Sequence, residues 1–129
     1  MSHPISSKLP AIFVHVSDLR RAADFYTKLL GVSYDPKEDY GNGIYVIRLA
    51  DGADLLLDAN HSHEAEARTL FSMHATCMFA TQDIDAAHGW LQKQGVEIVT
   101  EVFRDPAVSF FNFKDPDGNV QMICQSSQP

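Results

Sequence analysis

The feature that most constrains the fold of this chain is an internal repeat. The segment DLRRAADFYTKLLGV at residues 18–32 returns, one residue shorter, as DIDAAHGWLQKQGV at residues 83–96. Each copy starts with an aspartate suited to cap a helix, continues with apolar residues at helical spacing, and ends with a glycine where the chain can leave the helix. The sequence therefore predicts two helices in equivalent places and a chain made of two similar halves.

Strand-like runs surround each of the two predicted helices. They lie at residues 11–16, 32–35, 44–49 and 53–58 in the first half, and at residues 75–81, 96–100, 108–113 and 120–124 in the second. Each half therefore reads as a strand, a helix and three further strands, and we expect those last three strands to form a meander. A helix covers only one face of such a sheet. Two halves side by side thus predict an α+β fold, in which two βαβββ modules form a curled, open-sided, eight-stranded mixed sheet with the helices outside.

The two halves fit in a single domain. With 129 residues, of which 45% are hydrophobic, the chain is long enough for one well-packed core and short for two. We expect one domain over residues 1–129, with a first module at residues 9–58, a linker at residues 59–73 and a second module at residues 74–125. A cavity on the open side of the shared sheet is then the default place for a ligand.

Composition and charge argue against several classes of partner. The net charge is −7 and the ten basic residues are scattered, whereas nucleic acids and anionic membranes call for a basic surface. No apolar run approaches the roughly 20 residues of a membrane span, and the N-terminal residues lack the apolar core of a signal peptide. Cys77 and Cys124 lie in strand-like runs without a close-spaced motif, which favours buried free thiols. We expect a cytoplasmic protein without nucleic-acid or membrane partners.

Two motifs carry a resemblance to a known superfamily. The pattern D-L-x-x-A-x-x-F-Y-x-x-x-L-G covers residues 18–31, and the turn D-P-D-G-N at residues 115–119 precedes the final strand. In this order and within a repeat, they resemble the vicinal oxygen chelate superfamily, which comprises glyoxalase I, bleomycin-resistance proteins and extradiol dioxygenases. The resemblance covers about residues 9–125, so what it implies concerns nearly the whole chain.

In metal-dependent members of that superfamily, the ligands are His, Gln or Glu on the first strand of each half and a carboxylate or His on the last. Counting from the capping aspartates and the D-P-D-G-N turn places three of these positions at Ala11, Thr76 and Met122. The fourth falls at Leu56, with Asp58 one inward step away. Such side chains cannot together hold a zinc or iron ion, which takes about three His, Cys or carboxylate ligands. The resemblance therefore implies a homodimer with no cofactor and a pocket for a small organic molecule.

Side chains that contact such a molecule are expected on strands of both halves. Flat aromatic residues stack against planar ligands with little loss of entropy, and strand alternation puts His15 on the same face as Ala11. The net negative charge of the chain suits a cationic ligand. The predicted ligand-binding residues are Phe13, His15, Tyr45, Leu56, Asp58, Thr76, Phe111 and Met122.

Two other functions remain open. His15, His74 and Asp58 are the set that resembles a two-His, one-carboxylate metal site, although the strands would have to slip in register to bring them together. With zinc, nickel or iron, this set would make the protein a glyoxalase-type lyase or a dioxygenase. In the other alternative, His15 is the catalytic acid–base group of a metal-free enzyme, because imidazole groups titrate near neutral pH. The absence of ligand-type side chains at the positions counted above favours a binding protein over both.

Overall fold

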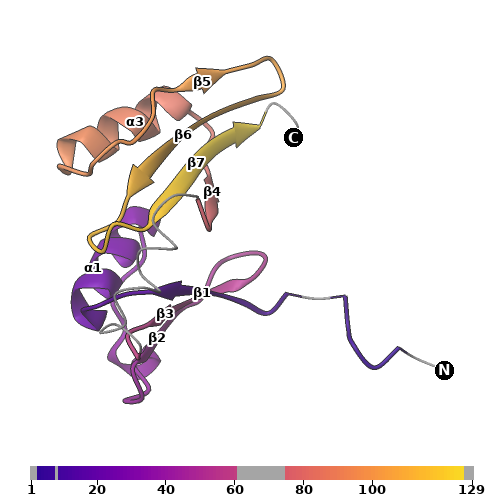
Figure 1. Cartoon of the computed structure of the whole chain (residues 1–129), viewed down its shortest axis with the longest axis vertical. Helices are drawn as coiled ribbons and strands as arrows, with labels where there is room; N and C mark the ends of the chain where they lie inside the picture. The colour runs from indigo at the N-terminus through magenta and orange to yellow at the C-terminus, as the bar shows by residue number, and fades with distance from the viewer. Residues whose placement is uncertain (1–2, 8, 61–74, 127–129) are drawn as a thin grey trace. The chain divides into compact units, whose positions relative to one another are not determined.

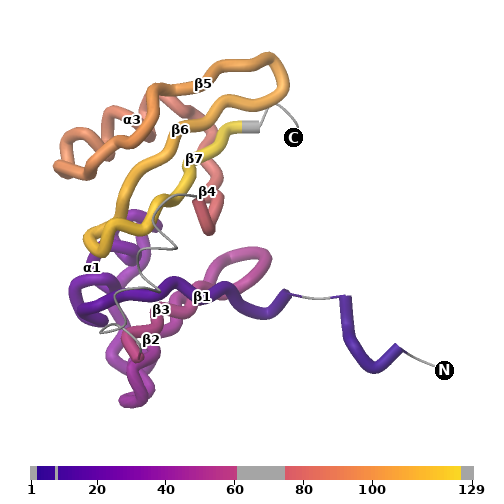
Figure 2. Tube along the Cα trace, in the orientation of Figure 1, coloured from indigo at the N-terminus to yellow at the C-terminus, as the bar shows by residue number. Residues whose placement is uncertain are grey.

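The chain consists of two compact units that divide at residue 61, within the predicted linker at residues 59–73. The computed structural model describes residues 3–7, 9–60 and 75–126. Each unit combines a β-sheet with a helix. Figures 1 and 2 show the elements of the first unit in indigo to magenta and those of the second in orange to yellow.

The first unit is built around a three-stranded mixed sheet. Its elements are β1 (Ala11–His15), α1 (Leu19–Leu30), the short 3₁₀ helix η1 (Pro36–Glu38), β2 (Ile44–Ile47) and β3 (Asp54–Asp58). The strand order is β1-β3-β2, in which β3 is parallel to β1 and antiparallel to β2. Among the described residues, β1 and β2 are therefore the two edges of this sheet.

The helix α1 begins and ends as predicted. Asp18 caps its start, because a side-chain oxygen of Asp18 accepts a hydrogen bond from the backbone N–H of Arg21 at 3.1 Å. The helix ends at Gly31, whose φ of 68° lies in the left-handed region that glycine tolerates. The helix packs against β2 and β3. The core of the unit is formed by Val14, Val16, Ala22, Ala23, Tyr26, Tyr45, Ile47, Leu55 and Leu57.

The second unit has a four-stranded mixed sheet. Its elements are β4 (Met78–Ala80), α3 (Ile84–Lys93), β5 (Phe103–Arg104), β6 (Val108–Lys114) and β7 (Val120–Ser126). The strand order is β4-β7-β6-β5, in which β4 is parallel to β7 and the other neighbours are antiparallel. Asp83 caps α3 by accepting the N–H of Ala86 at 3.0 Å, as its place in the repeat predicts. The helix packs against β6 and β7 over a core of Cys77, Phe79, Ile84, Leu91, Phe111, Phe113 and Ile123.

The D-P-D-G-N turn between β6 and β7 is organised by its first aspartate. Asp115 is buried, and one of its carboxylate oxygens accepts the backbone N–H groups of Asp117 at 2.9 Å and Asn119 at 2.8 Å. The other oxygen accepts the side-chain amide of Asn119 at 2.8 Å. Gly118 supplies the left-handed backbone that the turn requires, with a φ of 85°. The motif thereby sets the register of β6 against β7.

The α+β class and the pair of helix-bearing modules with mixed sheets are confirmed. The antiparallel pairing of β6 with β7 agrees with the sequence prediction, but the third strand of this meander is β5, in a stretch where no strand is predicted. The strands predicted at residues 32–35 and 96–100 differ: the first segment forms no strand, and the second forms one isolated bridge between Ile98 and Phe113. The described residues therefore contain sheets of three and four strands where the sequence predicts eight strands. Within the described part of the chain, every helix is too short or too polar to span a bilayer.

Candidate functional site

One face of the sheet in the first unit is not covered by α1. Strand alternation turns Val14 and Leu57 toward the helix, and therefore turns their neighbours outward. We call these outward residues the first open face: Ala11, Phe13, His15, Ile44, Val46, Asp54, Leu56 and Asp58. Phe13, Leu56 and Val46 are partners in strand register and form an apolar row across the middle of this face. The side chain of Phe13 is 53% exposed.

His15 and Asp58 lie next to each other at one end of the first open face. They are register partners on the parallel strands β1 and β3. His15 is exposed, and the partly buried Asp58 accepts the backbone N–H of Asn60 at 2.9 Å. Two members of the alternative metal set are thus neighbours, while the third, His74, lies outside the described residues. Within the described ranges, no three His, Cys, Asp or Glu side chains come together as a metal site.

The opposite end of the first open face carries a network around Arg48. Its guanidinium donates to Glu38 at 3.0 Å, to Asp54 at 3.1 Å and to the Tyr40 hydroxyl at 3.0 Å. The Tyr40 hydroxyl in turn donates to Glu38 at 2.7 Å. Hydrogen bonds from Arg48 and then from Tyr40 hold the pKa of Glu38 below its usual range, so this carboxylate stays charged. The network ties η1 and the loop after it to the end of β2.

In the second unit as well, one face of the sheet is turned away from the helix, α3. Phe79 and Ile123 point into the core under α3, so their neighbours along the strands point outward. We call these outward residues the second open face: Met78, Ala80, Phe103, Phe110, Asn112, Met122 and Cys124, of which Cys124 is buried between its neighbours. Met78 and Phe103 are 68% and 51% exposed, and the rings of Phe103 and Phe110 have their centres 5.1 Å apart. Flexible thioethers beside aromatic rings adapt to ligands of varied shape.

Leu56 and Met122 occupy equivalent positions in the two units. Phe13 and Met78 lie at the same distance before the two capping aspartates, and they pair with Leu56 and Met122 respectively. Each unit therefore holds an apolar side chain at the centre of its open face. By the family resemblance, these are positions at which metal-dependent relatives carry ligands.

Two predicted ligand-binding residues lie in the cores instead, and a third, the exposed Thr76, bonds to a core side chain. Tyr45 and Phe111 are 2% and 0% exposed, because alternation along β2 and β6 turns both toward the helices. Tyr45 stacks on Tyr34 with ring centres 5.0 Å apart. Thr76 donates its hydroxyl to the buried side chain of Gln121 at 2.9 Å. The other five predicted residues, Phe13, His15, Leu56, Asp58 and Met122, lie on the two open faces.

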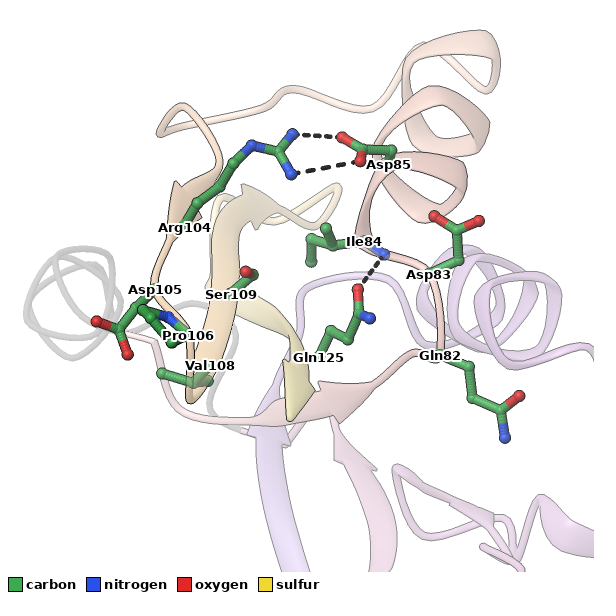
Figure 3. A pocket seen from close by; sticks show the side chains of 10 residues that line it. All are labelled: Gln82, Asp83, Ile84, Asp85, Arg104, Asp105, Pro106, Val108, Ser109 and Gln125. Carbon is green, nitrogen blue, oxygen red and sulfur yellow. Dashed lines mark hydrogen bonds and ion pairs between the residues drawn. The ribbon is translucent and has the colours of Figure 1, made fainter. Parts of the chain in front are cut away.

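A polar hollow of about 370 Å³ lies between the start of α3 and the β5–β6 hairpin (Figure 3). Three aspartates line it together with one cation, Arg104. Arg104 pairs with Asp85 across the hollow, and this contact lowers the pKa of Asp85. Gln125 accepts the backbone N–H of Ile84 at 2.8 Å. The cation is thus engaged, and none of the predicted ligand-binding residues lines this hollow.

Three comparisons place the chain among known proteins. YurT of Bacillus subtilis (strain 168), an uncharacterized protein, is 33% identical over 128 residues, which cover 92% of this chain and 98% of YurT. TnmS3 from Streptomyces sp. CB03234, described as an antibiotic binding protein, is 26% identical with a TM-score of 0.70, and the match covers 97% of this chain and 100% of TnmS3. A glyoxalase/dioxygenase from Nostoc punctiforme shares the fold at 17% identity, with a TM-score of 0.73 and 99% of each chain covered.

A family model gives the assignment. Residues 8–123 match the model of the Glyoxalase/Bleomycin resistance protein/Dioxygenase superfamily, so the match spans both units. This range also contains both capping aspartates and the D-P-D-G-N turn, whose hydrogen bonds are described above. With its repeated modules, its two mixed sheets and this match over most of its length, the chain belongs to the glyoxalase/bleomycin resistance protein/dioxygenase superfamily.

Proposed function

We propose that this protein binds a small, planar organic molecule on the apolar open face of a sheet and holds no resident metal. The observation that carries the proposal is the pair Leu56 and Met122, which are apolar side chains at equivalent central positions of the two open faces. A metal-dependent protein needs carboxylate, imidazole or thiolate ligands, and a leucine supplies none.

The surroundings of these two residues favour a flat and partly apolar ligand. Phe13 stands beside Leu56, and Phe110 lies near Met122 on the neighbouring strand. Aromatic side chains gain from stacking on planar groups, and exposed apolar patches mark binding surfaces. The net charge of −7 adds a preference for a cationic molecule over an anionic one.

Further observations support the wider proposal. The description of TnmS3 as an antibiotic binding protein supports a binding role. The exposed side chains of Phe13 and Met78 suit burial against a second copy of the chain, so the proposal includes a homodimer. Cys77 and Cys124 are free and buried, which suits a reducing compartment such as the cytoplasm.

Titration with proflavine, a planar cationic dye, tests the proposal on chelator-treated protein. We expect the dye to bind, and we expect Met122→Lys to weaken binding by about tenfold, because the new charge would stand at the centre of the second open face. Gln92→Lys on the exposed side of α3 adds the same charge elsewhere and should bind as the parent does. Circular dichroism verifies that both variants are folded. Equal binding by the two variants, or binding only after a metal is added, would contradict the proposal.

A metal-dependent enzyme is the second candidate, and it is favoured by the position of His15 directly beside Asp58. With His74 these residues would supply two imidazoles and a carboxylate to zinc, nickel or iron, as a glyoxalase-type lyase or dioxygenase requires. His15→Ala should then abolish metal binding. His3→Ala is the control, because His3 is an exposed residue outside the sheet. Unchanged metal binding in His15→Ala would remove this candidate.

A further inference from the structure

Within the described residues, the outer backbone edge of β2 has no strand partner at Val46, although the side chain of Val46 is buried. Ala59 donates its N–H to the carbonyl of Gly43 at 2.9 Å, and this bond fixes the ladder so that Tyr45 and Ile47 pair with β3 through hydrogen bonds. Val46 therefore directs its backbone N–H and C=O away from β3. Among the described residues, none forms a backbone hydrogen bond with these two groups.

The equivalent edge in the second unit is covered by the chain itself. Asn112 occupies the place of Val46, since each pairs with the central residue of the neighbouring strand. The N–H of Val99 donates to the carbonyl of Asn112 at 2.8 Å. The N–H of Asn112 donates to the hydroxyl of Thr100 at 2.9 Å. The Val99 N–H and the Thr100 hydroxyl oxygen thus satisfy the outward-pointing carbonyl and N–H of Asn112.

Tyr45 keeps the corresponding segment of the first unit away from the edge. Asp35 is equivalent to Val99 in the repeat, since each lies four residues after the glycine that follows its helix. The N–H of Asp35, however, donates to the hydroxyl of Tyr45 at 2.9 Å, and Tyr34 stacks on the same ring. Phe111 takes the place of Tyr45 in the second unit and has no hydroxyl, so Val99 bonds to the strand edge instead.

The result is a hollow of about 180 Å³ beside Val46. A water molecule takes up about 30 Å³ of the liquid, so this volume suits a short group and excludes a folded partner. Val32 gives the hollow one apolar wall, while Asp35 and Glu38 contribute carboxylates. Arg48 also lines it and is paired with Glu38, so Asp35 leaves the lining with one net negative charge. The wall therefore favours neutral or cationic groups over acidic ones.

We propose that this hollow at the outer edge of β2, where the backbone of Val46 and not its open-face side chain is engaged, is a binding site for a peptide-like group that places an N–H donor beside an oxygen acceptor. Such a group accepts from the N–H of Val46 and donates to its carbonyl. Val99 and Thr100 already make both of these bonds with Asn112 in the second unit. Extended amides add to exposed strand edges in the same way.

The blocked dipeptide acetyl-Val-Thr-methylamide, which copies residues 99–100, is the probe for this site. Titrated into nitrogen-15-labelled full-length protein, it should shift the backbone amide resonances of Val46 and Asp35. Shifts confined to the second open face, at residues such as Met78 and Phe103, would overturn the proposal. The absence of any shift at Val46 would overturn it as well.

Three controls distinguish strand pairing from nonspecific contact. The same dipeptide methylated on its valine nitrogen lacks the N–H that the Val46 carbonyl accepts, so it should bind about three- to tenfold more weakly. In Tyr45→Phe the N–H of Asp35 is released and can cover the edge as Val99 does, so the dipeptide should bind more weakly than to the parent. Met122→Lys should leave its binding unchanged. Equal binding of the two dipeptides, or their loss in Met122→Lys, would overturn the proposal.

Discussion

Gln121 is a buried polar residue at a position where the first unit has an apolar one. Its side chain is 0% exposed, and its side-chain oxygen accepts the Thr76 hydroxyl at 2.9 Å and the backbone N–H of Cys77 at 2.8 Å. Leu55 stands at the equivalent position of the first sheet, directly before the central residue of its strand. Gln121 therefore ties the chain that leads into β4 to the neighbouring strand β7.

Replacing Gln121 with leucine keeps a side chain of similar size and removes the acceptor. The buried N–H of Cys77 would lose its partner, which costs about 1–3 kcal/mol, and the lost bond from Thr76 adds about 0.5–1.5 kcal/mol. We expect Gln121→Leu to lower the free energy of unfolding by about 1.5–4.5 kcal/mol. Thr76→Val removes only the exposed donor and should lower it by about 1 kcal/mol.

Urea unfolding followed by tryptophan fluorescence measures both changes. Trp90 is the single tryptophan of the chain and lies on α3, so its emission reports the second unit even where the two units unfold separately. Far-ultraviolet circular dichroism on the same samples follows the whole chain. A loss in Gln121→Leu no larger than that in Thr76→Val would refute the reasoning, because the Cys77 N–H would then not depend on Gln121.

Three further predictions follow from contacts described above. Asp115→Ala should lower the free energy of unfolding by about 2–3 kcal/mol, because it removes the buried acceptor of the turn, whereas Asp105→Ala in an exposed turn should change it by less than about 0.5 kcal/mol. Gly31→Ala should lower it by about 1–2 kcal/mol through its left-handed φ, as urea unfolding would show. Arg48→Leu should raise the pKa of Glu38, measured by nuclear magnetic resonance titration. Because the pKa of Glu38 is lower in the folded state, Glu38 stabilises the protein above its unfolded pKa. This stabilisation is lost as the pH falls through its folded pKa, and the pH dependence should be weaker in Arg48→Leu.

Local signals in the sequence were sufficient for the helices and the final turn. Asp18 and Asp83 cap the helices as predicted, because their carboxylates bond to N–H groups three residues along the chain. The strand predicted at residues 32–35 fails for a reason that lies outside the segment. Its pattern suits a strand, but the hydroxyl of Tyr45, distant in sequence, binds the N–H of Asp35 and draws the segment off the sheet edge.

The sequence predicts the candidate site only in part, because the burial of a strand residue also depends on segments that are distant in sequence. Counting from motifs of the repeat singles out Leu56 and Met122, and both lie on the open faces. The β6 run has phenylalanines on both faces, so alternation alone does not tell which face meets the helix. The sequence predicts that Phe111 contacts a ligand, but its side chain is buried under the helix. The sequence alone does not identify Met78 as an exposed side chain, because its exposure depends on which segments cover the sheet and not on the pattern of its own strand.

The metal content of untagged protein, purified without chelator, tests most directly whether this is a metal-free binding protein. Plasma mass spectrometry should be applied before and after titration with zinc, nickel and ferrous ions. We expect no stoichiometric metal, since Leu56 and Met122 stand at the centres of the open faces. About one ion per chain, lost in His15→Ala, would contradict a metal-free binding protein and would favour a metal-dependent enzyme built on His15 and Asp58.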